Sequence, residues 1–397
     1  MKPFGNVPAH EEKMNLIWRF GMVLMVVLGS ISSPSAEPTE QDSIPSLLSS
    51  IRISKPLDLC GEKVPIGQQD VRERLEKELM LSLWNRPQVI LWLKRSNRYF
   101  PVIEQMLKEQ GLPEELKFIA VAESALLPHI TSGKGAVGFW QFIKSTGQQY
   151  GLVIDERIDE RRNIFASTRA AILYLKELYD IFQSWTLAAA AYNMGEKRLM
   201  AEIQEQGVSD YYQLYLPLET QGYVFRILSA KLIFLDPKQY GFDLSHADYY
   251  PPLNTDRVTV NLPQDTPIRI IAQAAKTHFK EIKELNPEFR GHYVPKGEIA
   301  LSIPGGSETR FKALLGEFFR KWSEDETEQL YLVKEGDNLT IIAGRFGVPV
   351  ASLLRWNRLD PKAHIHPGDQ LKIFHKKVRE EVIKPDDDLN NGPYFLD

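Results

Sequence analysis

Glu123 is the residue whose type and position point most directly to chemistry. Pro113 can begin a helix, and Leu116, Ile119 and Ala120 share one face of that helix with Glu123 through their three- and four-residue spacing. A carboxylate on an apolar stripe either pairs with a cation or loses water, and loss of water raises its pKa toward the range of a general acid. A single buried glutamate is more often structural than catalytic. The sequence blocks that accompany Glu123 must therefore decide between a structural and a catalytic role.

Several polar and aromatic blocks accompany this glutamate in a fixed order. After Glu123-Ser124 they are Ser132, Gly138-Phe139-Trp140-Gln141, Ala191-Tyr192-Asn193-Met194-Gly195, Glu219-Thr220 and Tyr223. Together they resemble the catalytic domain of the lytic transglycosylases, a family related in fold to goose-type lysozyme, over about residues 103–234. The resemblance implies an all-α, lysozyme-like catalytic domain. Phe139-Trp140 replaces the commoner Leu-Met, a change that we expect to tune a sugar subsite.

The resemblance implies a reaction on peptidoglycan in which one carboxyl group acts twice. Glu123 would protonate the glycosidic oxygen between N-acetylmuramic acid and N-acetylglucosamine as general acid. As the carboxylate it would then take the proton of the muramoyl C6 hydroxyl, which attacks C1 and leaves a 1,6-anhydro end. Such an intramolecular attack has a high effective molarity. The family is thought to use the substrate's own N-acetyl group, so a second carboxylate is not required.

The resemblance also assigns supporting roles. Ser132 would orient the C6 hydroxyl or a water, Gln141 and Asn193 would hydrogen-bond the sugars, and Tyr223 would hold Glu123. The aromatic rings of Tyr192 and Trp140 offer stacking faces for sugar. Each assignment has a structural alternative: Asn193 as a turn cap near Gly195, Tyr192 and Trp140 as core, and Ser124 bonded to its own helix. For Ser124 the structural alternative is favoured.

Other motifs do not indicate a cofactor or a metal. Gly133, Gly135 and Gly138 fit G-x-G-x-x-G, but they follow a predicted helix where a dinucleotide site needs a strand. The acidic residues of 155–160 alternate with arginines, which favours a salt-bridged surface. His364 and His366 have no third ligand nearby in the sequence. We therefore predict no cofactor and no metal.

Composition limits the classes of partner. The 397 residues are 43% hydrophobic and carry a net charge of −4, which gives no basic footprint for nucleic acid. Cys60 is the single cysteine, so an intramolecular disulfide is excluded. We predict peptidoglycan glycan strands as the partner and no binding of nucleic acid, and the sequence indicates no particular protein partner. The sequence leaves association with the outer membrane and the oligomeric state open.

The middle of the chain is predicted to be helical, over residues 70–245, with helices beginning at Pro87, Pro101 and Pro113. Residues 37–69 are interpreted as a linker, and a composition change near 246–254 marks the end of the domain.

An internal repeat follows, in which residues 71 positions apart correspond, so that Ile268 aligns with Leu339. The second unit, residues 330–375, resembles a LysM domain, and the first, 257–304, looks like a degenerate copy with Asp265-Thr266 where the second has Gly336-Asp337. LysM domains are small α+β (βααβ) modules that bind N-acetylglucosamine-containing glycans. Residues 376–397 are predicted to be disordered.

The N-terminus indicates export. Arg19 precedes an apolar run at 20–28 that small residues follow, which is typical of a signal peptide ending near residue 36. An uncleaved N-terminal anchor is the alternative. No cysteine follows the run, so a lipoprotein anchor has no attachment point. We predict a location in the periplasm or cell envelope of a Gram-negative-type bacterium.

The leading hypothesis is an exported peptidoglycan lytic transglycosylase that LysM modules hold on the cell wall. One rival is a wall-binding scaffold whose helical domain binds glycan without cleaving it. The other is a muramidase that lets water attack C1. The transglycosylase and the muramidase need the same acid, so the sequence separates these two enzymes poorly.

Overall fold

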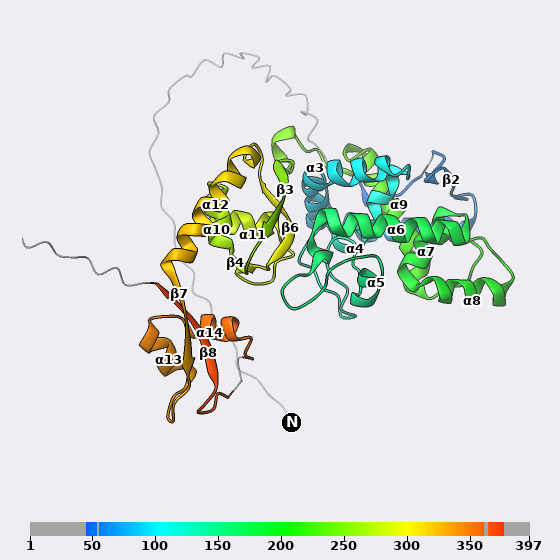
Figure 1. Cartoon of the computed structure of the whole chain (residues 1–397). Coiled ribbons are helices and arrows are strands. Elements are labelled where there is room, and N and C mark those ends of the chain that lie inside the picture. Colours follow the sequence, from blue (N-terminus) through cyan, green and yellow to red (C-terminus); the bar gives the residue numbers. More distant parts are fainter. Residues whose placement is uncertain (1–44, 54, 361–363, 377–397) are drawn as a thin grey trace, which may run out of the picture. The chain divides into compact units, whose positions relative to one another are not determined.

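A computed structural model describes residues 45–53, 55–360 and 364–376 (Figure 1). The predicted signal peptide and the predicted tail, except Lys376, lie outside the described residues. The described chain contains one helical domain followed by two small α+β modules, each with its own apolar core. A helical domain followed by small modules of strands and helices is the fold class that the sequence predicts.

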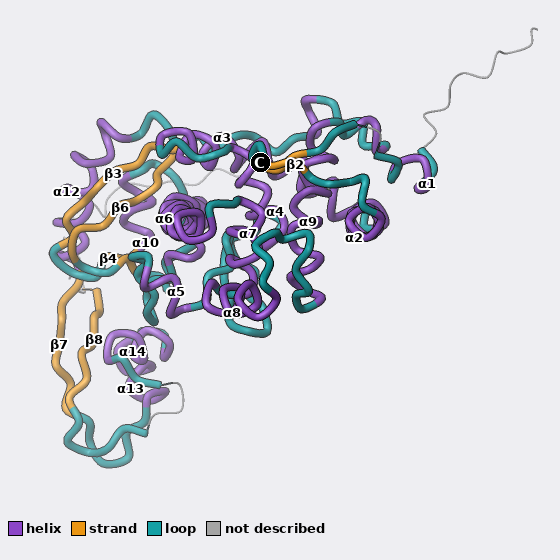
Figure 2. The backbone as a smooth tube through the Cα atoms, turned by 90° about the vertical axis from the view of Figure 1, so that its right-hand side faces the viewer, coloured by secondary structure: helices purple, strands orange, loops and turns teal. Residues whose placement is uncertain are grey.

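The helical domain extends from residue 47 to residue 248. Its elements are α1 (Leu47–Ser50), β1 (Asp58–Leu59), β2 (Glu62–Lys63), α2 (Gln69–Trp84), α3 (Arg86–Glu109), η1 (Glu114–Leu116), α4 (Lys117–Ser124), α5 (Lys144–Gln149), η2 (Glu160–Arg162), α6 (Ile164–Phe182), α7 (Trp185–Met194), α8 (Glu196–Gln206), α9 (Leu218–Leu235), η3 (Lys238–Tyr240) and η4 (His246–Asp248). Helix α9 packs against α2, α4 and α7, and α6, seen end-on in Figure 2, packs against α3 and α7. The residues of α9 that point inward, such as Val224 and Leu228, are fully buried.

The prolines mark helix starts at two of the three predicted positions. Pro87 lies in the first turn of α3, and Pro113 precedes η1 and α4. The prediction for Pro101 is wrong, because α3 continues through it. An internal proline costs about 3 kcal/mol, and burial of Phe100, Ile103 and Leu107 on the same helix offsets that cost.

The prediction of a linker over residues 37–69 is wrong for the described part of that segment. Leu57, Leu59 and Val64 are buried in the core of the helical domain, and β1 pairs with β2 in a short hairpin. The carboxylate of Glu62 accepts hydrogen bonds from the backbone amides of Trp185 and Thr186 at the first turn of α7. A negative charge at a helix N-terminus stabilises the helix. The segment is thus an integral part of the domain.

The first module is built on two antiparallel strands. Its elements are β3 (Thr255–Leu262), β4 (Thr266–Pro267), α10 (Ile268–Ala274), α11 (Phe279–Leu285), β5 (Tyr293–Val294), β6 (Gly297–Pro304) and α12 (Glu308–Asp325). Strand β3 pairs with β6, and β4 with β5. Phe311 and Leu315 of α12 join the core of this module. The folded unit therefore extends beyond the predicted end at residue 304.

The second module repeats the plan with β7 (Glu326–Leu332), α13 (Leu339–Phe346), α14 (Val350–Asn357) and β8 (Gln370–Lys376). One asparagine in each module makes the same hydrogen bonds. The amide of Asn286 binds the carbonyl of Ile282 and both backbone groups of Ser302. Asn357 binds Leu353 and Lys372 in the same way. These bonds join the second helix to the closing strand, so the repeat read in the sequence is a repeat of structure.

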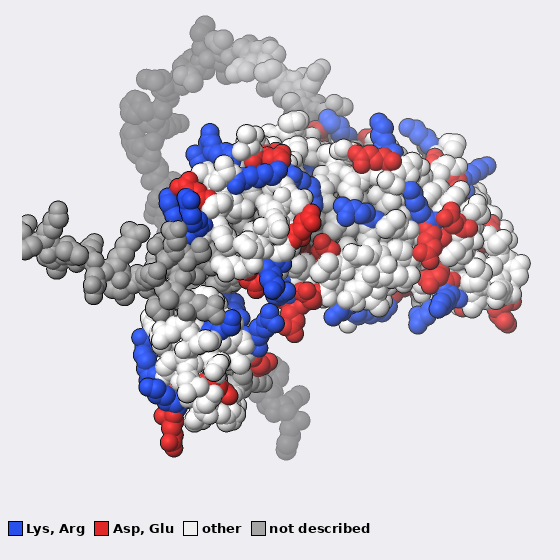
Figure 3. All heavy atoms as spheres, in the orientation of Figure 1, with Lys and Arg blue, Asp and Glu red and all other residues white. Residues whose placement is uncertain are grey.

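Acidic and basic side chains are intermixed over the face drawn in Figure 3. Among the described residues, no helix combines the length and the apolar character that a membrane span needs.

Candidate active site

Helix α4 presents Glu123 at its last turn. The helix ends there because Ala125 adopts the left-handed conformation, with φ of 54°. The hydroxyl of Ser124 donates to the carbonyl oxygens of Ala120 and Phe139, at 3.1 and 2.8 Å. Ser124 is buried and bonded to its own helix, which confirms the structural alternative for this residue. Its second bond ties the end of α4 to the segment that contains Gln141.

Glu123 is half-buried and has one strong hydrogen-bond partner. The hydroxyl of Tyr223, on α9, donates to Oε1 of Glu123 at 2.6 Å. Burial raises the pKa of Glu123 from 4.5 to about 7, although the Tyr223 hydrogen bond favours the carboxylate and acts in the opposite direction. A carboxyl group with such a pKa can lose and regain a proton near neutral pH. The structure thus brings together the predicted acid and its predicted holder.

Two further charges act on Glu123, and sequence reasoning assigned a role to neither. The guanidinium of Arg226 lowers the pKa of Glu123, and the carboxylate of Glu219 raises it. Arg226 also lies 3.5 Å from Oε2 of the buried Glu78, and Glu219 forms an exposed ion pair with Lys134 at 3.6 Å. Both residues lie on α9 at helical spacing from Tyr223, a pattern visible in the sequence once Tyr223 is given its role.

Gln141 and Ser132 lie in the loop of residues 131–142, which we call the site loop. Gln141 has a φ of 49°, and its Nε2 donates to the carbonyl oxygens of Gly138 and Ile130 at 2.9 and 3.3 Å. These bonds leave its Oε1 as the acceptor. Ser132 is exposed, and its Oγ accepts from the Ala136 amide at 3.1 Å. The Lys134–Glu219 ion pair links this loop to the start of α9.

The two predicted stacking residues have different environments. Trp140 is fully buried and donates its indole N–H to Thr168 at 2.9 Å, so it is core and offers no stacking face. Phe139 is buried as well. Neither ring is placed to touch a bound sugar, so Phe139-Trp140 would tune a sugar subsite only through the packing beneath it. Tyr192 on α7 is only partly buried, and its hydroxyl donates to the Trp140 carbonyl at 2.7 Å.

Asn193 connects α7 to α9. Its Oδ1 accepts from the hydroxyl of Thr220 at 2.8 Å, and the side chain is half-buried. Thr220 is buried, so this bond fixes the orientation of the Asn193 amide. No prediction from the sequence gave Thr220 a role of its own.

Backbone strain gathers around the site. Ala125, Leu126 and Gln141 have φ values of 54°, 60° and 49°, a region that costs non-glycine residues about 1 kcal/mol or more each. Ala125 and Leu126 follow Glu123-Ser124 directly, and Gln141 is a predicted sugar-binding residue. Strain of this kind is typical of functional sites. Residue type gave no signal for it, because alanine, leucine and glutamine rarely adopt this conformation.

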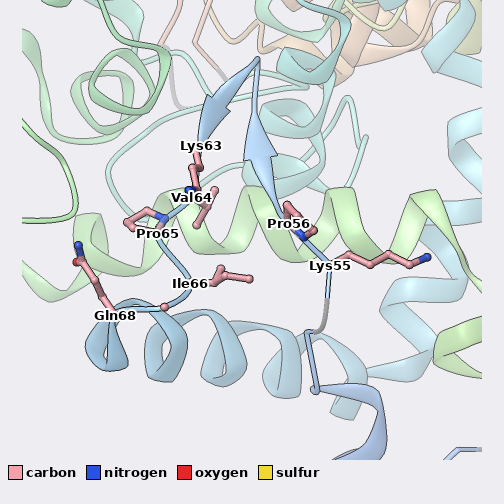
Figure 4. A pocket seen from close by; sticks show the side chains of 8 residues that line it. Lys55, Pro56, Lys63, Val64, Pro65, Ile66 and Gln68 are labelled. Atoms are coloured by element: carbon pink, nitrogen blue, oxygen red, sulfur yellow. The ribbon is translucent and has the colours of Figure 1, made fainter.

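A separate hollow of about 530 Å³ lies beside the N-terminal hairpin and the start of α2 (Figure 4). Lys55, Lys63, Val64 and Gln68 are among the residues that line it. None of the predicted site residues is among them, so the hollow is not part of the candidate active site.

Comparison with known proteins places this arrangement in a family. The Transglycosylase SLT domain matches residues 100–214, the LysM domain matches 331–374, and the LysM-like domain of lytic transglycosylase MltD matches 254–318. Membrane-bound lytic murein transglycosylase D of Escherichia coli K12 is 30% identical over 329 residues, which are 79% of this chain and 71% of that protein. The chain belongs to the lytic murein transglycosylases. The same protein from a second E. coli strain matches to the same extent.

Solved lytic transglycosylases are also similar to parts of this family member. The 70 kDa soluble lytic transglycosylase of E. coli is 19% identical with a TM-score of 0.32, over 44% of this chain and 32% of that chain. The Pseudomonas aeruginosa lytic transglycosylase Slt is 22% identical with a TM-score of 0.27, over 37% and 26%.

Proposed function

We propose that this lytic murein transglycosylase cleaves the β-1,4 bond between N-acetylmuramic acid and N-acetylglucosamine and leaves 1,6-anhydro-muramic ends. One observation carries the proposal: the carboxyl group of Glu123 is half-buried, held by Tyr223 at 2.6 Å, with its pKa raised to about 7. A group in this state can serve as acid in one step and as base in the next.

In the first step, protonated Glu123 gives its proton to the glycosidic oxygen. The bond from that oxygen to C1 of the muramoyl ring breaks, and the N-acetylglucosamine side leaves with a new hydroxyl. Positive charge develops on the muramoyl ring as in other glycosidases. In the second step, the C6 hydroxyl attacks C1 and its proton returns to Glu123, so the enzyme ends in its starting state.

The surrounding residues would bind and orient the glycan. Oε1 of Gln141 is the acceptor that its own loop leaves free, and it would receive a hydrogen bond from a sugar hydroxyl or N-acetyl N–H. Thr220 occupies Oδ1 of Asn193, so the amide N–H groups of Asn193 would donate to sugar. The Ser132 hydroxyl, which accepts from Ala136, keeps its proton for the substrate. Tyr192 would supply a ring edge.

Glu219 bears on the rival muramidase mechanism. It is the other carboxylate whose charge acts on Glu123, and a retaining hydrolase would need such a group as nucleophile. Its ion pair with Lys134, on the exposed surface, instead favours a role in the charge balance of the site. A scaffold that only binds glycan would have no use for a carboxyl group whose pKa is raised by burial.

Mass spectrometry of fragments released from purified peptidoglycan sacculi tests the proposal. The chain lacking residues 1–36 is incubated with sacculi, and Glu123→Gln is the control because it keeps the size and the Tyr223 contact. We expect 1,6-anhydro-muramic ends that are absent with the variant. Reducing ends would establish the muramidase instead, and sacculus binding without release would establish the scaffold.

We further propose that the protein is exported to the periplasm or cell envelope and that residues 330–375 hold it on peptidoglycan. The signal-like residues 1–36 and the LysM match support this. Cell fractionation with N-terminal sequencing tests export: we expect a chain in the envelope fraction that begins near residue 37. An unprocessed chain in the cytosol would refute it.

A further inference from the structure

The first module is joined to the helical domain through main-chain hydrogen bonds. The amide of Asp159 donates to the carbonyl of Glu288 at 2.9 Å, and the amide of Arg290 donates to the carbonyl of Arg157 at 2.8 Å. Between them, Ile158 and Phe289 form an antiparallel bridge. The segment of residues 155–163, which precedes α6, is thus paired with the segment of residues 288–290, which follows α11.

A buried polar pair strengthens this contact. Nδ2 of Asn163 donates to Oε1 of Glu288 at 2.8 Å, and both side chains are buried, with exposed fractions of 6% and 3%. Asn163 also caps α6 by accepting from the amides of Phe165 and Ala166. An exposed ion pair between Arg157 and Asp265, at 3.3 Å, lies at the edge of the contact. Buried bonds of this kind contribute far more than exposed ion pairs.

The same segment holds the site loop from the other side. The buried guanidinium of Arg161 binds both carboxylate oxygens of Asp159, at 2.8 and 2.9 Å. Its remaining nitrogen donates to the carbonyl oxygens of Gly135 and Phe142, at 2.9 and 3.1 Å. These two residues flank Gly138 and Gln141, so one side chain fastens the loop at two points.

The contacts form a continuous path from the module to the site loop. Glu288 binds the main chain of Asp159 and the side chain of Asn163, Asp159 orients Arg161, and Arg161 orients the site loop. A module that served only as a tether would need no such path. A flexible linker would be enough to keep the enzyme near glycan, without contacts between the module and the catalytic domain.

We propose that the first module, residues 254–318, is an internal brace whose docking on residues 155–163 makes Asp159 and Arg161 positioning residues for Ser132 and Gln141. This inference rests on the proposed function, because the site loop matters for turnover only if it binds substrate. It gives the degenerate LysM copy a role within the enzyme.

Amide hydrogen exchange on the full chain tests the brace without reference to activity. Glu288→Ala removes the buried acceptor, Glu288→Gln keeps an acceptor of the same size, and Asp265→Asn is the matched control at the edge of the contact. We expect exchange of residues 131–142 to be about tenfold faster in Glu288→Ala, with the other two variants close to the wild type. The ratio of kcat to KM on soluble glycan should fall in the same variant and recover in Glu288→Gln.

Two outcomes would overturn the brace. Exchange that speeds up near Glu288 but stays unchanged over residues 131–142 would show that the module does not position the loop. Equal acceleration in α2 and α9 would show a general loss of stability. If Glu288→Ala does not fold, Ile158→Ala replaces it, because Ile158 packs on the core of the module and is only partly buried. Absence of 1,6-anhydro products in the wild type would refute the proposed function. The hydrogen-exchange result would still show whether the module positions the site loop.

Discussion

At the scale of single residues, the proposed role of Glu123 as the general acid makes its pKa the property that sets the pH range of the reaction. The acid must be protonated to begin cleavage, and burial raises its pKa to about 7. We therefore expect kcat/KM on soluble glycan to fall as the pH rises through about 7. Glu219→Gln should move this fall to lower pH, because Glu219 raises the pKa of Glu123. Rates measured across pH 5 to 9 check both expectations.

The matched control is Glu205→Gln, an exposed glutamate of α8 that is not among the charges acting on Glu123. It should leave the pH profile where it is. If Glu219→Gln abolished turnover at every pH, Glu219 would be a nucleophile and the muramidase mechanism would gain support.

The raised pKa also makes stability depend on pH. The folded state binds the proton of Glu123 more tightly than the unfolded state, so the contribution is present below pH 4.5 and is lost as the pH rises through about 7. Above that pH the ionised carboxylate costs at most about 3 kcal/mol. Glu123→Gln, which cannot ionise, should raise the melting temperature relative to the wild type at pH 8 more than at pH 5. Equal differences at the two pH values would show that Glu123 is not desolvated.

At the scale of elements, the site loop depends on one close approach. Gly138 has a φ of 84°, and a Cβ there would lie 1.8 Å from the carbonyl oxygen of Arg161. Gly138→Ala should therefore displace the loop, destabilise the fold by about 2 kcal/mol or more, and lower kcat/KM. Gly133→Ala, where no atom lies within 4 Å of the added Cβ, should change neither. Thermal unfolding and rates on soluble glycan check the pair, and equal behaviour of the two variants would contradict this account.

Periodic patterns in the sequence predict the elements well where packing is local. The apolar stripe that ends in Glu123 is a real helix face, and the repeat at 71 residues is real in structure. The prediction failed at Pro101, because burial of Phe100, Ile103 and Leu107 along the same helix outweighs the local rule that proline begins a helix. It also failed for residues 45–69, whose two-residue strands are too short for a periodic signal.

The candidate site could be predicted only in part from the sequence, for a similar reason. Glu123 and Tyr223 meet as predicted, although 100 residues separate them in the chain. Trp140 became core because its partner is Thr168, a contact that no local pattern encodes. The strained backbone of Gln141 and the charge of Arg226 likewise arise only once the helices have packed.

At the scale of the whole molecule, the two modules should fail differently. Asn357→Ala removes the bonds that join α14 to β8, at a cost of roughly 2 to 3 kcal/mol, which a module with a small core tolerates poorly. We expect sacculus binding to weaken while turnover of soluble glycan stays unchanged. Asn286→Ala makes the equivalent change in the brace and should lower turnover of soluble glycan. Pull-down on sacculi and rates on soluble glycan distinguish the two, and unchanged sacculus binding by an unfolded second module would contradict the tethering role.

The paired asparagines have a consequence for how such a chain can change over generations. Each one fastens its module through main-chain groups of the closing strand, which every amino acid except proline supplies. The surfaces of the two modules are therefore free to diverge while their skeletons stay the same. After a duplication, one copy can keep an ancestral sugar-binding surface while the other copy acquires a surface that packs on protein. Neither change requires a new fold.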